Sequence, residues 1–296
     1  MSVAEASDVE SRALPNTVVF AFVKALAAEL SEGQVELPSV PQVVIQLQKT
    51  LSDECVSNDT VVRLIGSEPM FAARLMTMAN SVALNASARR IADLRTAVAR
   101  VGFNIVRSVA LSFAVEQLRK AVEFQHLATH LDVLWKDSVK TATLCHVIAR
   151  RFTSLNGDTA LLAGLMHNVG RIYILTRASR FPALTADPLT YQSIVRDWHA
   201  NVAKALLESW KVSDEIVEAV GGHEDLDREA RGPVTLTDVL SLAMLVEDSR
   251  AGTEMLTPGE ALLKGLKRMQ LQLHDCHSVI NESAEEIAAL TDALGG

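Results

Sequence analysis

Apolar residues recur at intervals of three and four along most of this chain, which is the period of an amphipathic helix. Clear examples are residues 131–152, with Leu134, Trp135 and Ile148 on one face, and residues 190–210. No segment alternates between apolar and polar residues over a useful length. The pattern therefore predicts an all-α protein of roughly a dozen helices.

Caps and helix breakers divide the chain into the expected helices. Asn16 can cap a helix that carries Phe20 and Leu26 on its apolar side and ends before Gly33. Pro41 suits the first turn of the next helix. Further helices are expected over residues 59–67 (capped by Asn58 or Asp59), 69–80, 91–101, 104–118, 213–222 and 235–248, and a long last helix over residues 258–280.

The stretch from Leu161 to Leu175 is apolar on nearly every side, which is typical of a helix buried in the middle of a bundle. It is too short to cross a bilayer, which takes roughly 17 to 25 residues. Within it lie His167 and Asn168, followed closely by Gly170. A buried imidazole is costly unless it has a partner, so the partner of His167 decides what this site does.

Composition limits the possible classes of protein. The chain has 296 residues, 49% of them hydrophobic, and a net charge of −8, which argues against a general nucleic-acid binder. Its three cysteines form no CxxC pair, and the sequence His274-Asp275-Cys276-His277 cannot converge on one ion within a helix. The first dozen residues lack the features of a signal peptide, and no segment is expected to cross a membrane. We therefore predict a cytoplasmic protein.

Several motifs follow one another in a characteristic order. They are Leu37-Pro38-Ser39-Val40-Pro41, Pro69 to Leu75 with Ala79-Asn80-Ser81, Ile91 to Gly102, Trp135 to Ser138, Ala163 to Gly170, His199 and Trp210. Over about residues 36 to 225 the chain resembles the HDOD signalling domain, a relative of the HD phosphohydrolases. The resemblance implies an HD-like bundle of two packed helical sub-bundles and a regulatory role in bacterial signal transduction, usually without catalysis.

The resemblance also suggests how the chain is divided. Residues 1–35 would form an N-terminal tail and helix, and residues 36–230 the HDOD domain. Within that domain, an N-terminal sub-bundle would cover about 36–120 and an HD-like sub-bundle about 121–230. Residues 231–296 would supply C-terminal helices that pack on the bundle.

The resemblance points to a site that differs from a catalytic one at two positions. HD phosphohydrolases bind one or two divalent ions through histidines and carboxylates. Here the His-Asp pair is His167-Asn168, and Asp137 stands at the upstream histidine position. His199 and His223 remain from the pattern, and the later acidic position falls on Asp238. An amide is a weak, uncharged ligand that bridges metals poorly.

Two interpretations follow. In the first, Asp137 pairs with His167 in a relic site, Asn168 bonds the backbone, and the protein is neither an enzyme nor dependent on a metal or other cofactor. His199 and His223, taken alone, then suit surface or helix-capping positions. In the second, a reduced metal site built from His167, Asp137, His199 and Asp238 serves a phosphohydrolase or phosphodiesterase.

The expected partner is a signalling protein or a small nucleotide ligand, held beside His167. Five arginines between positions 89 and 107 could bind an anion or form internal ion pairs. The helices over residues 59–67 and 69–80 have the spacing of a helix-turn-helix, but they offer only Arg74, Thr77 and Asn80 as readers, so DNA binding is disfavoured. The apolar stripe of residues 258–280 could cover the bundle or serve as a homodimer seam.

Overall fold

The computed structural model describes residues 16–33, 35–53, 55–85, 89–228, 232–251 and 259–295. The described residues form helices and no strands, which confirms the all-α prediction. The α-helices are α1 (Asn16–Ser31), α2 (Gln42–Leu51), α3 (Asn58–Gly66), α4 (Pro69–Ala79), α5 (Leu94–Lys120), α6 (Ala128–Phe152), α7 (Gly157–Met166), α8 (Val169–Ala178), α9 (Pro182–Thr185), α10 (Pro188–Ser209), α11 (Asp214–Gly222), α12 (Leu236–Ala251), α13 (Glu260–Arg268), α14 (Leu273–Glu282) and α15 (Ala284–Leu294). A 3-10 helix, Val122–Leu127, joins α5 to α6.

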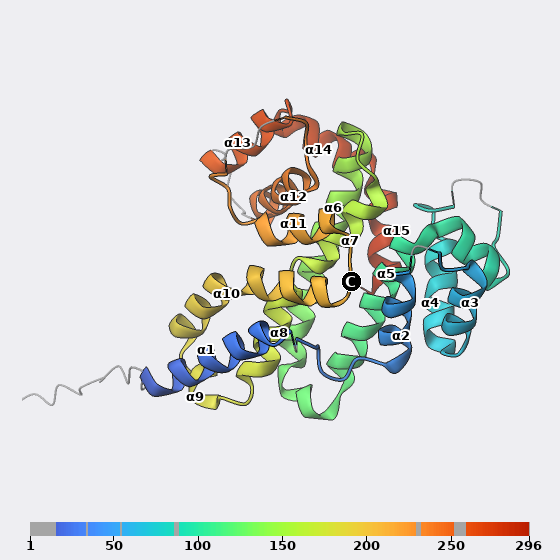
Figure 1. The fold of residues 1–296 in the computed structure, drawn as a ribbon. Helices are drawn as coiled ribbons and strands as arrows, with labels where there is room; N and C mark the ends of the chain where they lie inside the picture. Colours follow the sequence, from blue (N-terminus) through green and yellow to red (C-terminus); the bar gives the residue numbers. More distant parts are fainter. Residues whose placement is uncertain are drawn as a thin grey trace, which may run out of the picture.

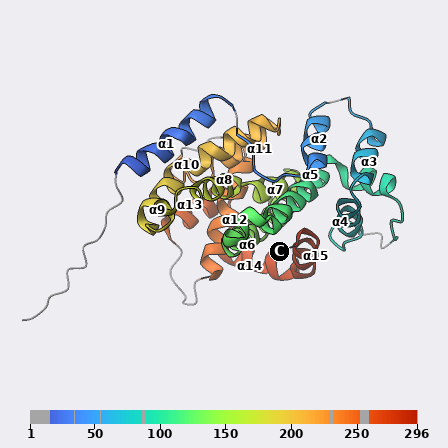
Figure 2. The same ribbon diagram turned by 90° about the horizontal axis from the view of Figure 1, so that it is seen from below.

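The helices gather into two groups that share α5 and α6. Helices α2, α3 and α4 pack on α5, while α6 and α7 make the most extensive helix pair of the second group, together with α8, α10 and α11 (Figure 1). Helices α12, α14 and α15 pack against α6, and α15 also contacts α4 and α5 (Figure 2). The domain boundaries expected near residues 35 and 230 stay predictions.

Local signals explain several helix ends. The Asp93 side chain accepts a hydrogen bond from the Thr96 amide at the start of α5, and Gly102 kinks this helix with φ 75°. The kink matches the predicted break between residues 101 and 104. Ser57, rather than Asn58 or Asp59, caps α3. Pro41 precedes the first residue of α2 instead of occupying it.

Helix α5 is long and apolar enough to cross a membrane by length and composition, which the sequence pattern did not lead us to expect. Two thirds of its most apolar window, 67%, is buried inside the protein. Its Glu116 side chain forms an ion pair with Arg74 of α4. These features are typical of the core helix of a bundle, while the cytoplasmic location stays a prediction.

The predicted long last helix is wrong, because α13 ends at Arg268 and α14 begins at Leu273. Gln270 between them has φ 58°, which an α-helix does not allow. The apolar stripe is nevertheless used inside the protein, since Leu262 and Cys276 are both buried. It therefore covers the bundle; the homodimer stays a prediction. The expected helix start at residues 257–258 lies outside the described residues.

Two expectations about apolar faces also need correction. Phe20 is 69% exposed, while Phe22 and Leu26 face the core from α1. The Leu161–Leu175 stretch is buried as expected, but it is two helices that separate at His167 and Asn168.

Glycines let neighbouring helices approach this broken segment closely. A methyl group at Gly164 would overlap the backbone of Ala142 on α6, and one at Gly170 would overlap the carbonyl oxygen of His199 on α10. These two contacts hold α7 and α8 against the helices that carry the rest of the site.

Candidate functional site

The His167-Asn168 pair lies at the break between α7 and α8, and both side chains are buried. His167 Nδ1 is 2.6 Å from the carbonyl oxygen of Gly164 in the last turn of α7. A carbonyl only accepts, so Nδ1 carries the proton and Nε2 is left with a lone pair in the neutral ring. The end of α7 thus fixes which ring nitrogen is available to a partner.

Asp137 of α6 is the partner that faces this nitrogen. Its Oδ2 atom is 3.6 Å from His167 Nε2 and accepts a hydrogen bond of 2.8 Å from Asn168 Nδ2. The contact with His167, followed by that with Asn168, holds the pKa of Asp137 below its ordinary value. The Asn168 amide reaches the backbone oxygen of Leu134 only at 3.5 Å, so the expected backbone partner is secondary.

His199 and His223 join the pair, and neither is a surface residue: both are almost completely buried. The His223 ring centroid lies 5.7 Å from those of His167 and His199. His223 Nδ1 is 2.6 Å from the carbonyl oxygen of Val220 at the end of α11, which repeats the arrangement at His167. Its buried Nε2 has no hydrogen-bond partner among the described residues. Burial, then the nearby His167, lowers the pKa of His223 to about 3.

Glu224 completes the cluster, and sequence reasoning missed it. His199 Nε2 is 2.7 Å from Glu224 Oε2, and Arg171 NH2 is 2.7 Å from Oε1. Although burial acts in the opposite direction, the contact with His199 holds the pKa of Glu224 well below its ordinary value. The available signal was a carboxylate directly after His223, at the end of a predicted helix.

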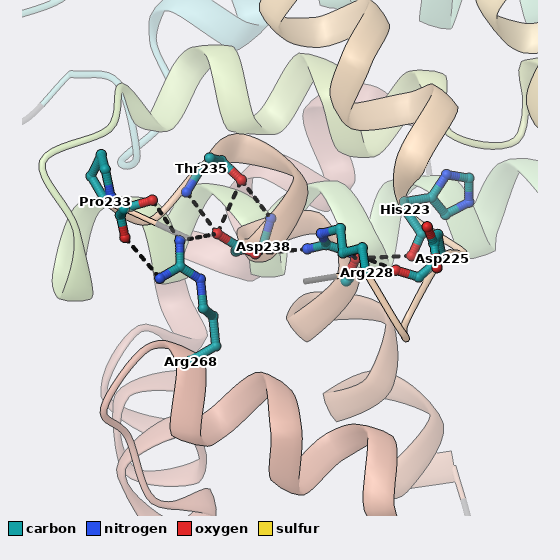
Figure 3. Close-up of polar contacts among 9 residues, drawn as sticks. His223, Asp225, Arg228, Pro233, Thr235, Asp238 and Arg268 are labelled. Carbon is teal, nitrogen blue, oxygen red and sulfur yellow. Dashed lines mark hydrogen bonds and ion pairs between the residues drawn. The ribbon is translucent and has the colours of Figure 1, made fainter. Parts of the chain in front are cut away.

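Asp238 does not join the histidines. Its Oδ1 forms a 2.7 Å ion pair with Arg228, while its Oδ2 lies 3.2 Å from Arg268 and accepts the Thr235 amide at 2.8 Å (Figure 3). Both oxygens are therefore used between the start of α12 and its neighbours. The fourth ligand expected at Asp238 is not brought to the site.

A divalent ion fits these residues in one arrangement and not in another. One ligand atom each from His199, His223 and Glu224 lies within 4.8 Å of the others, so this group could hold a single ion. A bridged pair of ions does not fit, because the bridging position is Asn168 and its amide N–H already points at Asp137.

A cavity of about 710 Å³ opens beside the histidines between α6, α8, α12 and the end of α11. It is lined by Val133, Leu134, Asp137, Thr141, His167, Arg171, Arg196, His223, Glu224, Leu226, Ser241, Met244, Leu245, Glu247 and Asp248. Burial, then the neighbouring carboxylates of Asp137 and Glu247, raises the pKa of Asp248 above its ordinary value. Sequence reasoning missed Glu247 and Asp248, which stand near the end of α12 and far from the histidines in sequence.

The other candidate surfaces have partners within the protein at several positions. In the basic stretch, Arg95 forms an exposed ion pair with Asp59 at 2.7 Å, and Arg107 donates to the carbonyl oxygen of Leu51 at 2.6 Å, while binding of an anion there stays a prediction. Of the possible DNA readers, Arg74 pairs with Glu116, and Asn80 bonds the backbone of the segment before α5.

Comparison with known proteins places the chain in a family. The HDOD domain model matches residues 37–226, more than half of the chain. This match defines a protein of the HD-related class. The chain belongs to the HDOD family, as the motifs indicated.

Solved structures share the fold. A candidate metal-dependent phosphohydrolase from Shewanella amazonensis SB2B is 24% identical, with a TM-score of 0.71, and the match covers 94% of this chain and 99% of that one. A candidate signal transduction protein from Marinobacter aquaeolei VT8 is 18% identical, with a TM-score of 0.60, over 94% and 66% of the two chains. An uncharacterized protein of Treponema pallidum (strain Nichols) is 22% identical over 68% of this chain, which spans only 40% of that protein.

Proposed function

We propose that this HDOD protein is a non-catalytic regulatory module of signal transduction. It would act by binding a partner protein or a small signalling ligand in the cavity beside His167 and Asp137. The observation that carries the proposal is the state of Asn168, a buried amide whose N–H group donates to Asp137.

The reason is chemical. Metal-assisted phosphoester hydrolysis needs anionic oxygens that gather and neutralise the ions. Here the position next to His167 supplies a neutral amide, and that amide occupies an oxygen of the adjacent carboxylate. The hydrogen bond between Asn168 and Asp137 therefore links α6 to the break between α7 and α8, and the cavity remains available to bind a partner.

A second function has an observation in its favour. The convergence of His199, His223 and Glu224 supports a metal-dependent phosphohydrolase with a single ion, which would supply a hydroxide and neutralise phosphate charge. His199 and Glu224 are in direct contact at 2.7 Å, so an ion would have to separate them.

Metal analysis combined with turnover separates the two functions. Protein purified without chelator is analysed for Mn, Fe, Ni and Zn and assayed on nucleotides and cyclic dinucleotides, alongside His223→Ala. His274→Ala is the matched control, because its side chain is 82% exposed and remote in sequence. The regulatory proposal predicts no turnover and no metal that depends on His223. A stoichiometric ion lost in His223→Ala but kept in the control, together with turnover, would contradict it.

A further inference from the structure

The wall of the cavity that carries the site presents mainly hydrogen-bond acceptors. His223 commits Nδ1 to a carbonyl oxygen, which leaves its Nε2 as an acceptor, whereas His167 Nε2 faces Asp137. His223 Nε2 is a buried atom without a partner among the described residues, on a ring that lines the cavity. Asp137 and Asp248 add carboxylate oxygens.

Several donors at this wall already have partners. Arg171 NH2 is held by Glu224, although the buried Nε of the same side chain has no partner among the described residues, and the Asn168 amide donates to Asp137. The Ser241 hydroxyl donates to the backbone oxygen of His223, and Arg196 lies beside Asp197. The acceptors and carboxylates of this wall therefore favour a ligand that brings its own N–H or O–H groups and a positive charge.

Apolar residues line the same cavity beside these polar groups. Leu134, Met244 and Leu245 belong to the lining, as do Val133 and Leu226, which are 63% and 36% exposed. Such an apolar lining suits the aliphatic stem of a long cationic side chain, whose charged end reaches the polar groups.

We propose that this cavity receives an arginine side chain from a partner protein. The guanidinium would donate to Asp137, Asp248 and His223 Nε2, and the stem would lie on the apolar lining. This inference rests on the proposed regulatory function and names the chemistry of its partner.

Charge and size favour arginine over the other occupants. Four carboxylates against two arginines make the cavity acidic, which repels the phosphates of a nucleotide. The volume of about 710 Å³ far exceeds what one ion fills, whereas it accommodates a side chain with its flanking backbone. A guanidinium offers five N–H donors in a fixed fork and is weakly hydrated, so it matches several acceptors better than an ammonium does.

A matched pair of small probes tests the proposal. N-acetyl-arginine methylamide and N-acetyl-citrulline methylamide have similar length and shape, but only the first is charged. Each is titrated into the protein in the presence of EDTA and followed by NMR. We expect the arginine probe to bind at least tenfold more tightly than the citrulline probe, with shifts at residues lining the cavity.

Variants locate the binding. Asp248→Asn should weaken the arginine probe at least fivefold, and it is expected to fold because Asp248 is exposed. Glu208→Gln on α10, outside the cavity, is the control and should leave affinity unchanged. Equal affinity for the two probes, or equal effects of both variants, would overturn the proposal.

The test also separates this inference from the function on which it rests. Absence of arginine binding, in protein that has neither turnover nor a stoichiometric metal, overturns the arginine proposal and leaves the regulatory function standing. Turnover with a stoichiometric metal overturns the regulatory function and the arginine proposal with it.

Discussion

Replacement of Asn168 by aspartate restores the His-Asp pair of the HD enzymes and sharply perturbs the site. In the protein as it is, Asn168 Nδ2 donates to Asp137 Oδ2 over 2.8 Å. In Asn168→Asp, two carboxylates meet at that distance. The variant loses a hydrogen bond to a charged group and gains a like-charge contact.

The loss of stability in Asn168→Asp is set by the less costly of two states of the carboxyl pair at positions 137 and 168, both charged or one protonated. Two like charges 4 Å apart repel by about 4 kcal/mol at an effective dielectric constant near 20. Protonating one carboxyl instead costs about 4 kcal/mol at pH 7, since each pKa unit is worth 1.36 kcal/mol and an unperturbed Asp has a pKa near 3.9. Because the Asp137 side chain is half exposed, screening reduces the cost. We expect a loss of about 2–3 kcal/mol in the free energy of unfolding, or roughly 5–10 °C in Tm.

The pH dependence gives the decisive measurement. The folded variant contains a carboxyl group whose pKa is raised above its unfolded value, so the loss is absent near pH 4 and grows as the pH rises toward 7. Thermal unfolding is measured from pH 4 to 8 for the wild type, Asn168→Asp and Asn168→Ala, which removes the hydrogen bond without adding charge. The reasoning is refuted if Asn168→Asp is as stable as the wild type at pH 7, or if it follows Asn168→Ala at every pH.

Three further changes test other parts of the structure. Gly170→Ala should lower the free energy of unfolding by about 1–3 kcal/mol in chemical denaturation, because the added methyl group overlaps the His199 carbonyl. Gly221→Ala is the control: a Cβ there meets only ordinary side-chain contacts, so the free energy of unfolding should stay equal or rise. Asp238→Asn should lower the free energy of unfolding by about 2–4 kcal/mol, because it leaves Arg228 and Arg268 without their carboxylate. Since the folded pKa of Asp238 is lowered, its contribution to stability is present above pH 4 and lost in more acidic solution. Thermal unfolding in acid that is identical for the variant and the wild type would contradict this account. His223 is buried with a pKa near 3, so unfolding takes up a proton below pH 6.5; stability should fall by about 2 kcal/mol between pH 6.5 and 5, and His223→Gln should reduce that slope by about one proton.

Features with a local cause could be predicted from the sequence. The Asn156 cap of α7 and the break at Gly102 follow from side chains and backbone freedom within a few residues. The break at His167 could not be predicted in the same way. A break between two helices can be recognised in a sequence when the polar face of the first helix does not continue in register into the second. The segment around His167 is apolar on all sides, so it has no polar face that could show such a change.

The composition of the site depended on contacts distant in sequence. Asp137, His199 and His223 were found because the family pattern marks their positions. Glu224 and Asp248 gained a role only when α11 packed against α7 and α10, and α12 against α6 and α7, which no spacing in the sequence reports. Asp238 shows the opposite error: it was assigned to the site because the family pattern has an acidic residue there, but its carboxylate forms ion pairs with two arginines instead.

The position of α15 has a consequence for the order in which the chain folds. The carbonyl oxygen of Leu294 accepts hydrogen bonds from Ser112 Oγ on α5, at 2.7 Å, and from Trp135 Nε1 on α6, at 3.3 Å. These contacts join residues 182 and 159 positions apart, and such long loops close late. Until they form, the buried indole of Trp135 faces water. The closing step of folding thus changes the surroundings of Trp135, one of three tryptophans in the chain, which stands two residues from the site carboxylate Asp137.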